Sequence, residues 1–590
     1  MAKSEKEQKF KEHSRCHISN LETRKLKDEV ERLKKELKLK KKYGLVWEDK
    51  PEEVVEMCKK KLPVLKDVKN KEIITDKNKP VNLLIEGDNY HALSVLNYTH
   101  AKKIDVIYID PPYNTGNKDF IFNDHYVDKE DFYRHSKWLS FMEKRLKLAK
   151  NLLKDTGVIF ISIDDNEAAQ LKMLMDQIFG EENFVNAFYV QVRYAQKTLA
   201  EISDYQKLIE QVLIYSRTKN GFKPNKPSEE YDLSKFKYRI IEKKKGKKID
   251  LGGKKVEIFL PGQYQIIEEK AGSVNLLKAT WATGALLRTT AKFFANYLEE
   301  RKTIDGLGVL YKVYGIGEDG LGYRYFTGPK RAEATKGLFF SGVPSSRREE
   351  IENGNGSKKE KPIVNFYDYS ADFGNIRHEG GVGFRSGKKP VKLLKNLINL
   401  HKNKNALVLD FFAGSGSTGH AVLDLNNEDG GNRQFILSTN NEENICTDFC
   451  YPRIKNVIRG WGRNEGLGGN LKYFKTDFVD YDEPTDRNKI KLTKQATEML
   501  CVKEGTFEQV IDNEKFKIFK NSDHYTGIIW DQVAILAFKK AIKDIKGKFS
   551  VYVFSLTDET FDDEFKDVKQ KIGLSPIPEA ILQVYRRIFK

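Results

Sequence analysis

Short apolar runs alternate with longer amphipathic segments in two separate parts of the chain. In the first part, apolar runs cover residues 81–87, 104–110 and 156–164, and helical patterns cover residues 88–100, 138–153 and 165–180. In the second part, a strand, a glycine-rich turn and a helix occupy residues 405–425, and a further strand and helix occupy residues 433–441 and 445–461. Runs rich in Ile and Val that are separated by helices are typical of a buried parallel sheet. The pattern therefore predicts one α/β domain whose sequence is interrupted.

The interruption and the tail follow different patterns. Residues 219–361 are rich in Lys, Gly, Tyr and Arg without this alternation, which predicts an inserted domain of irregular or β-rich structure with charged joints. Residues 481–590 contain a helical pattern and a separate apolar run, which predict a small C-terminal α/β domain. The two parts of the interrupted domain are then residues 45–218 and 362–480.

Residues 1–44 predict a charged helix. Leu26, Val30, Leu33 and Leu37 are spaced 4, 3 and 4 apart, a seam of barely two heptads. A sustained coiled coil takes about three or four heptads. Pairing with a second copy and packing on the rest of the protein therefore stay equally open.

Composition adds a preference for polyanions. The 590 residues carry a formal charge of +18 and a pI near 9.2, which suits nucleic acid, although an excess of lysine also serves solubility. No apolar run approaches the roughly 18 residues of a membrane span, and the N-terminus lacks a secretion signal, so we expect a cytoplasmic protein without a membrane partner. The five cysteines are scattered, and Cys446 and Cys450 are interpreted as buried thiols, so no metal site is predicted.

A glycine-rich turn at residues 409–422, LDFFAGSGSTGHAV, joins a predicted strand to a helix. Small residues there let a ligand approach the backbone and the helix N-terminus. Gly414, Gly416 and Gly419 also match the dinucleotide pattern GxGxxG, so a nicotinamide oxidoreductase is a competing interpretation. A dinucleotide site needs an acid at the tip of the next strand, where this chain has Thr and two Asn at 439–441.

The tetrapeptide DPPY at residues 110–113 is more discriminating. Asp110 closes a predicted strand, so its carboxylate should project at the carboxyl edge of the sheet, where ligands bind in open α/β folds. Pro111 and Pro112 stiffen the backbone and leave the Pro111 carbonyl as an outward acceptor, while Tyr113 offers an aromatic face. Two acceptors beside a ring match the exocyclic amino group of a flat base. A strand exit with a capping Asp is the alternative.

Together, DPPYNTG and FAGSGST resemble the target-base and cofactor motifs of amino-methyltransferases that use S-adenosylmethionine. Their order resembles the permuted β group, with the catalytic motif first and the cofactor motif last, and Asp at the head of DPPY is the form usual for adenine N6 methylation. The stretches 438–462 and 468–479 resemble more closely the modification (Mod) subunit of type III restriction-modification systems. The implied fold is a Rossmann-like methyltransferase sheet with an inserted target-recognition domain.

The resemblance also implies roles for single residues. Asp110 and the Pro111 carbonyl would accept the N6 hydrogens of a flipped adenine, with Tyr113 stacking on the base. The cofactor S-adenosylmethionine would be bound by Asp410, Phe412, Gly414, Gly416, Thr418, Lys389, Asp88 and Asn440. Within this set, Asp410 would lie near the cofactor ammonium, Lys389 near its carboxylate and Asn440 near its ribose, with Asn441 as the alternative ribose contact. Lys389 as an exposed lysine and Asp88 as a helix cap are the alternatives.

The insert would read DNA, with Arg324, Lys330 and Arg331 as candidate contacts. The implied partners are double-stranded DNA, a restriction helicase-nuclease subunit and a second copy of the chain. A solitary adenine methylase, a catalytically silent DNA-binding subunit and a cytosine-N4 enzyme are the remaining alternatives.

Overall fold

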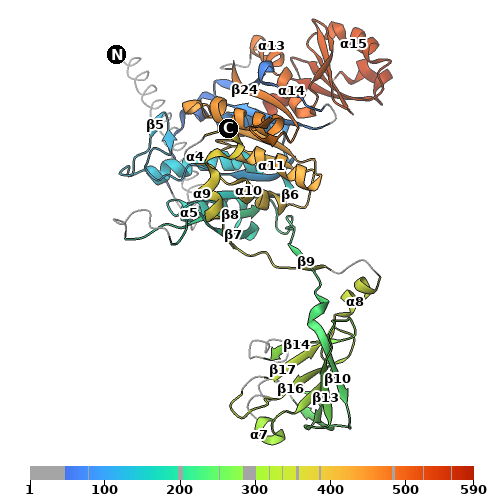
Figure 1. The fold of residues 1–590 in the computed structure, drawn as a ribbon. Helices are drawn as coiled ribbons and strands as arrows, with labels where there is room; N and C mark the ends of the chain where they lie inside the picture. The colour runs from blue at the N-terminus through green and yellow to red at the C-terminus, as the bar shows by residue number, and fades with distance from the viewer. Residues whose placement is uncertain are drawn as a thin grey trace, which may run out of the picture. The chain divides into compact units, whose positions relative to one another are not determined.

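The computed structural model describes residues 47–589 except for gaps at 77–78, 197–203, 252, 283–300, 318, 335–336, 354–357, 384–386, 482–484, 523, 558 and 560. The chain divides into two compact units. One combines the chain up to Asn225 with the chain from Val364, and the other is Lys226–Ile363 (Figure 1). The predicted N-terminal helix with its leucine seam lies outside the described residues.

A ten-stranded sheet forms the centre of the first unit. In spatial order its strands are β1 (Lys61–Asp67), β24 (Asn470–Asp480), β2 (Val81–Glu86), β21 (Gln434–Thr439), β20 (Leu407–Asp410), β3 (Ile104–Ile109), β6 (Leu153–Ile163), β8 (Ile209–Ser216), β7 (Phe184–Gln191) and β19 (Phe366–Asp368). The six strands from β24 to β6 are parallel, whereas β8 pairs antiparallel with both β6 and β7. All six residues of β3 are buried, as its run of Ile and Val predicts. The predicted α/β sheet is confirmed.

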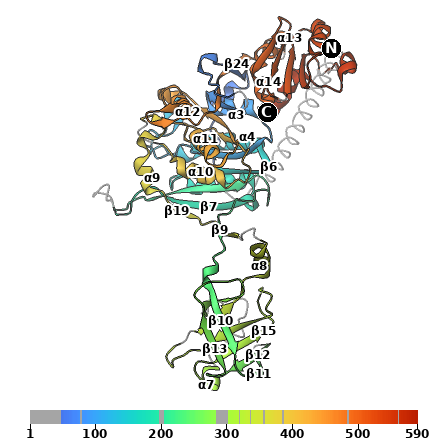
Figure 2. The same ribbon diagram turned by 45° about the vertical axis from the view of Figure 1, so that its right-hand side comes forward.

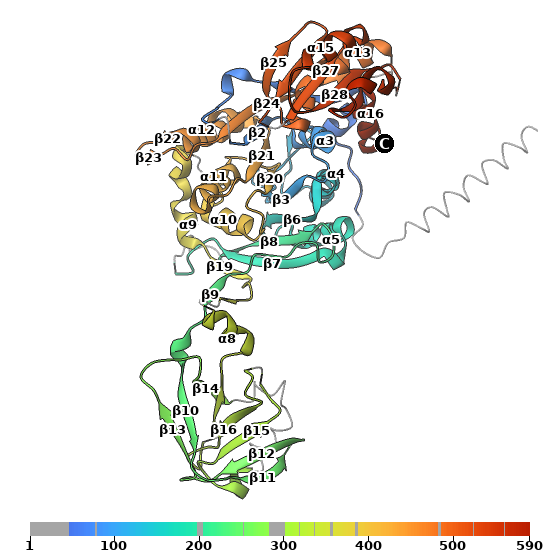
Figure 3. The ribbon, with the colours of Figure 1, turned by 90° about the vertical axis from the view of Figure 1, so that its right-hand side faces the viewer.

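Helices cover both faces of this sheet. They are α3 (Asn89–Thr99), α4 (Arg134–Leu152) and α5 (Ala168–Phe179) on one face, and α10 (Val391–Asn399), α11 (Ser417–Asp429) and α12 (Tyr451–Arg459) on the other (Figure 3). Strands β20 and β21 come from the second part of the sequence and are inserted between β2 and β3 from the first. The two parts of the interrupted domain are therefore one structural unit, and both contribute to its centre.

The second unit is built on an eight-stranded sheet in which every neighbouring pair is antiparallel (Figure 2). In spatial order its strands are β11 (Lys247–Leu251), β12 (Lys254–Phe259), β15 (Leu310–Tyr314), β16 (Tyr323–Thr327), β17 (Gly337–Ser341), β14 (Leu277–Ala282), β10 (Phe236–Glu242) and β13 (Tyr264–Glu268). Ile258 and Tyr311 belong to one apolar cluster, and their neighbours Phe259 and Leu310 belong to another. Alternate residues of these strands thus pack on opposite faces.

The tail has its own five-stranded sheet of β25 (Glu508–Asp512), β26 (Phe516–Lys520), β27 (His524–Ile529), β28 (Lys548–Phe554) and β29 (Ile572–Ile577). One face packs under α15 (Ile535–Ile542), where Phe538 and Val551 are buried. Tyr552 and Ile577 instead belong to the main core of the first unit. The tail therefore shares a core with the central sheet. None of the described helices combines the length and apolarity that crossing a membrane requires.

Candidate active site

The loops after β3 and β20 open into one pocket of about 1100 Å³. The two strands are parallel neighbours, with Val106 opposite Val408 and Ile107 opposite Leu409, so both loops leave the same edge of the sheet. The DPPY motif follows β3, and the glycine-rich turn follows β20. Two motifs about 300 residues apart in the sequence therefore line a single cavity.

The catalytic motif forms a tight polar cluster. The Tyr113 hydroxyl lies 2.9 Å from Asp110 Oδ1 and 3.0 Å from Glu210 Oε2. Lys389 Nζ lies 3.0 Å from Asp110 Oδ2, 3.2 Å from Glu210 Oε2 and 2.8 Å from the Tyr113 hydroxyl. Lys389 is 7% exposed, so it is not an exposed lysine. The structure places its ammonium against the DPPY motif, and its predicted contact with a cofactor carboxylate stays a prediction.

The two proline carbonyls of the DPPY motif differ in their partners. The Pro112 carbonyl accepts a hydrogen bond of 2.7 Å from Trp138 Nε1, and Trp138 is fully buried in α4. Among the described residues, no backbone or side-chain donor pairs with the Pro111 carbonyl, which belongs to the pocket lining. That carbonyl therefore has no protein donor, and its predicted role as an acceptor for a ligand stays a prediction.

Burial and charge compete at this cluster. Burial raises the pKa of Asp110, and the Lys389 ammonium opposes this rise, whereas Glu210 adds to it. Burial alone would lower the pKa of Lys389, but Asp110 and Glu210 outweigh it and the pKa is raised. Lys389 is therefore charged at neutral pH between two carboxylates. Glu210 comes from β8, and no sequence motif marked it.

The glycine-rich turn is held by its own side chains. Asp410 Oδ1 accepts a hydrogen bond of 2.9 Å from the Phe412 N–H, and Asp410 Oδ2 accepts one of 2.5 Å from the Thr418 hydroxyl. Burial raises the pKa of Asp410 to about 7. Asp410 and Thr418 thus shape the turn, and both line the pocket together with Phe412 and Gly414, whereas Gly416 is not among the lining residues. Gly416 has a φ of +79°, a conformation that glycine adopts without steric cost.

A buried arginine supports this turn from α12. Arg453 Nη1 donates to the Ser417 hydroxyl at 2.7 Å, and Arg453 Nη2 lies 2.9 Å from Glu379 Oε2. Glu379 lies in the segment that leads to Lys389. Arg453 therefore ties the turn to the segment that carries the buried lysine.

Asp88 and Asn440 are both placed on the pocket wall. The Asp88 carboxylate accepts a hydrogen bond of 2.7 Å from the Tyr90 N–H, so Asp88 caps α3, and it also lines the pocket. Asn440 follows β21 and lines the pocket. The Asn441 side chain instead accepts bonds from the next turn of the chain. Glu442 and Glu443 also line the pocket, so acids occur three and four residues beyond the strand end rather than directly at it.

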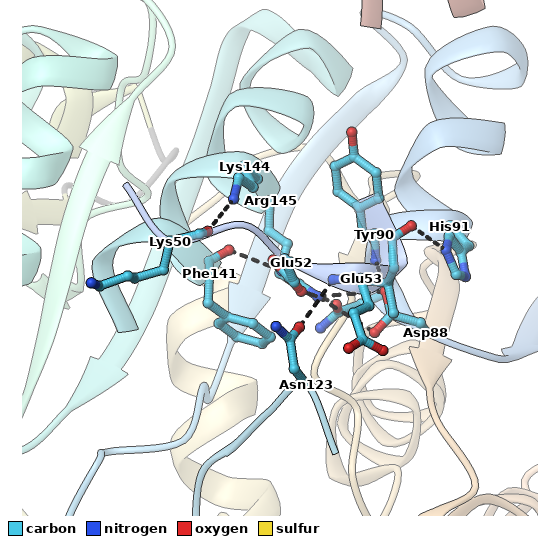
Figure 4. Close-up of polar contacts among 12 residues, drawn as sticks. Lys50, Glu52, Glu53, Asp88, Tyr90, His91, Asn123, Phe141, Lys144 and Arg145 are labelled. Carbon is cyan, nitrogen blue, oxygen red and sulfur yellow. Dashed lines mark hydrogen bonds and ion pairs between the residues drawn. The ribbon is translucent and has the colours of Figure 1, made fainter. Parts of the chain in front are cut away.

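A second ion-pair cluster, around Arg145, also lines the pocket (Figure 4). The fully buried Arg145 of α4 makes two bonds with Glu52, at 3.0 and 2.6 Å, and lies 3.4 Å from Asp88. Its guanidinium carbon lies 3.6 Å from the centre of the Phe141 ring.

Arg145 also connects this cluster to the glycine-rich turn. It donates to Asn89, whose amide donates to the Phe411 carbonyl at 3.1 Å. The segment before α2 (Glu53–Met57) is thereby fixed to the glycine-rich turn.

The residue after DPPY is held by a buried acid. Asn114 has a φ of +57° and donates to Glu167 Oε1 at 2.5 Å, while His135 Nδ1 lies 2.7 Å from the same oxygen. Burial raises the pKa of Glu167 to about 8, and burial with the nearby Arg134 lowers the pKa of His135. At neutral pH the contact therefore joins two neutral groups.

This cluster predicts a pH dependence of stability. The pKa of Glu167 in the folded protein is about 8, above its ordinary value of 4.5. The stability that protonated Glu167 provides is fully present below 4.5 and is lost as the pH rises through about 8. A Glu167→Gln variant cannot ionise, so its unfolding temperature relative to wild type is expected to increase steadily between these pH values. Thermal denaturation of both proteins across this pH range tests the prediction, with a variant of the exposed Glu181, Glu181→Gln, as control. A difference in unfolding temperature between Glu167→Gln and wild type that stays constant with pH would contradict it.

The candidate DNA contacts lie in the second unit. Arg324 of β16 lies 3.8 Å from the buried Asp319, and its guanidinium carbon lies 5.1 Å from the centre of the Phe339 ring. Lys330 and Arg331 are exposed on the loop that follows β16. Arg324 is thus held within its unit, whereas the other two are accessible. Among the described residues, no group of His, Cys, Asp and Glu is arranged to hold a metal.

Comparison with known proteins gives one family. Residues 104–449, more than half of the chain, match the family described as DNA methylase. The Mod subunit of the type III restriction-modification enzyme StyLTI from Salmonella typhimurium is 35% identical over 64% of this chain and 55% of that protein. The type II methyltransferase M.KpnI from Klebsiella pneumoniae is 32% identical over 62% of this chain and 82% of that protein. The Mod subunit of the type III restriction-modification enzyme EcoPI from Escherichia phage P1 is 28% identical over 61% of this chain and 58% of that protein. The chain thus spans little more than half the length of these Mod subunits.

Proposed function

Because this chain belongs to the DNA methylase family, we propose that it transfers a methyl group from S-adenosylmethionine to N6 of an adenine in duplex DNA. The observation that carries the proposal is the shared pocket, in which Asp110, the Pro111 carbonyl and Tyr113 lie beside the glycine-rich turn. The resemblance to Mod subunits at 35% and 28% identity supports a role as the modification subunit of a type III system.

The residues present fit the cofactor. Gly414 lines the pocket, and a Cβ built there would meet no atom closer than 3.8 Å, so the absent side chain leaves room for a ligand against the backbone. The N-terminus of α11 begins at Ser417 beside it, which favours a carboxylate. Asn440 and Glu442 offer polar groups to ribose hydroxyls. When bound, the cofactor would supply an electrophilic methyl group.

The chain's own residues would prepare the amine. The N6 atom of an adenine is hidden in the base stack of duplex DNA. The base must therefore rotate out of the duplex, at a cost of roughly a few kcal/mol. Stacking on Tyr113 would return about 1 to 3 kcal/mol. Asp110 and the Pro111 carbonyl would each accept one N6 hydrogen, which favours a nitrogen lone pair that is directed at the methyl group.

The larger assembly is also part of the proposal. The basic second unit would bind duplex DNA, with Lys330 and Arg331 at phosphates or base edges. A second copy of the chain and a restriction helicase-nuclease subunit are the proposed partners, and the cytoplasm is the proposed location. Co-purification with that subunit and light scattering of the isolated protein test the two partners.

Transfer of labelled methyl from the cofactor into duplex DNA tests the activity. We expect label in N6-methyladenine after digestion of the DNA to nucleosides and mass spectrometry. Label in N4-methylcytosine would assign the other chemistry of the family. Absence of label on DNA of diverse sequence, with the cofactor shown to bind by calorimetry, would favour a silent DNA-binding subunit.

A further inference from the structure

Lys389, Asp110 and Glu210 form a largely buried cluster of one ammonium and two carboxyl groups. Lys389 reaches Asp110 from the segment before α10, and Glu210 reaches the same ammonium from β8. The side chains of Lys389, Asp110 and Glu210 are 8%, 17% and 21% exposed. A buried ammonium between two carboxylates is costly to assemble unless each charge is paired. The burial of the Lys389 ammonium therefore indicates a role in the pocket rather than at the solvent-exposed surface.

The charge state of Asp110 decides what it can do to an amine. An ionised carboxylate accepts hydrogen bonds only, whereas a protonated one donates through one of its oxygens. An acceptor of an N6 hydrogen must therefore be ionised while the base is bound. Burial works against ionisation, and closing the pocket around a base would exclude more water and increase this effect. A fixed positive charge beside Asp110 counters it.

We propose that Lys389 is a positioning residue that keeps Asp110 ionised in the closed pocket, and that Glu210 moderates this effect by sharing the same ammonium. This inference deepens the proposed function and rests on it. Lys389 Nζ lies 3.0 Å from Asp110 Oδ2, and the Tyr113 hydroxyl lies 2.9 Å from Oδ1. The two partners hold both oxygens in place, with remaining lone pairs available to the amine.

The sharing explains why two acids face one lysine. If Lys389 were paired with Asp110 alone, the carboxylate would be bound so strongly that an incoming amine would compete poorly for it. Glu210 lies 3.2 Å from the same Nζ and 3.0 Å from the Tyr113 hydroxyl, so it competes with Asp110 for both donors. Glu210 therefore leaves Asp110 ionised but less tightly bound.

Two other titratable groups lie within electrostatic reach of Asp110. Tyr108 of β3 and Asp410 of β20 are both buried, and the nearby Asp110 carboxylate adds to the burial that raises the pKa of each. Among the residues that the structure describes, Lys389 is the ammonium in contact with Asp110, whereas Lys207 on the pocket wall pairs with Asp165 at 2.9 Å. Changing Lys389 therefore removes the positive charge that contacts Asp110.

The test is the pH dependence of single-turnover methyl transfer at saturating cofactor and DNA, which reports ionisation in the complex. Lys389→Met is expected to move the acid limb of the profile to higher pH by about 1 to 3 units, because an opposite charge at this range lowers an Asp pKa by that amount. Glu210→Gln is expected to move the limb to lower pH, because a like charge is removed. Lys389→Arg retains the positive charge and is expected to keep the wild-type limb.

Opposite shifts of the acid limb in Lys389→Met and Glu210→Gln distinguish an electrostatic role of Lys389 from a loss of structure. An exposed lysine near the same segment, Lys402→Met, serves as control and should reproduce the wild-type profile. An unchanged limb in Lys389→Met, or shifts of the same sign in the two variants, would overturn the inference. If Lys389→Met does not fold by thermal denaturation, the direction of the Glu210→Gln shift decides alone. An inactive wild-type protein at every pH would instead refute the proposed function.

Discussion

An Asp110→Ala variant is expected to transfer methyl groups at least about a hundredfold more slowly than wild type, the loss typical of removing one preorganised group that stabilises a transition state. Alanine removes the side-chain acceptor for the N6 hydrogens while leaving the Pro111 carbonyl and Tyr113 in the pocket. It also leaves Lys389 with Glu210 as its counter-charge, so the fold should persist. Single-turnover incorporation of labelled methyl into duplex DNA measures the rate.

Asp544→Ala is the matched control for this variant, because Asp544 is exposed in the tail and does not line the pocket. It should retain the wild-type rate. Cofactor binding, followed by the rise in unfolding temperature on addition of S-adenosylmethionine, should be present in both variants. A rate for Asp110→Ala within about threefold of wild type would contradict the importance given to charge stabilisation at this position.

An Arg145→Met variant is expected to lose about 3 to 5 kcal/mol of unfolding free energy, the cost of leaving a buried carboxylate without its partner. Arg145 is fully buried and makes two bonds to Glu52. Because this pair fixes the segment before α2 to the pocket wall, cofactor binding should weaken as well. Denaturant titration followed by tryptophan fluorescence measures the first effect, and calorimetry with the cofactor measures the second.

The double variant Glu52→Leu with Arg145→Met separates the pair from its surroundings. It should be more stable than Arg145→Met alone, because the buried Glu52 carboxylate is removed together with its partner, and the remaining Asp88 is partly exposed. Lys147→Met on the same helix is the control; its side chain is 61% exposed and its pairing with Glu143 should contribute less than about 1 kcal/mol. Equal destabilisation in the single and double variants would show that packing, rather than charge, makes Arg145 important.

The sequence predicted the central sheet because its strands are apolar on both faces. The runs that became β2, β3, β6, β20 and β21 are short, rich in Ile, Val and Leu, and bounded by turns. The pairing of β20 with β3 could not be read from periodicity, since strands from distant parts of a chain carry no mark of their neighbours. The sequence pattern and the resemblance to a permuted family supplied only the expectation of one sheet domain built from both parts of the chain.

Much of the site followed from motifs, and the remainder did not for a physical reason. Asp110, Tyr113, Phe412 and Gly414 lie in the pocket where the motifs indicated. Glu210 lies on an antiparallel strand with no distinctive neighbours. Arg145 and Glu52 are ordinary charged residues in the sequence, and only folding brings them together. A buried ion pair depends on three-dimensional proximity, which single-sequence patterns do not record.

The ends of the second unit have a consequence for how such proteins diversify. The chain leaves the first unit at Asn225, whose N–H donates to the Leu400 carbonyl, and returns beside Asn365, whose carbonyl accepts from the Tyr189 N–H. Both anchors are backbone hydrogen bonds that depend on no particular side chain. Recombination between relatives could therefore replace the intervening segment as a cassette. Under the DNA-binding role proposed for that unit, such an exchange would change which DNA is chosen while the pocket is inherited intact.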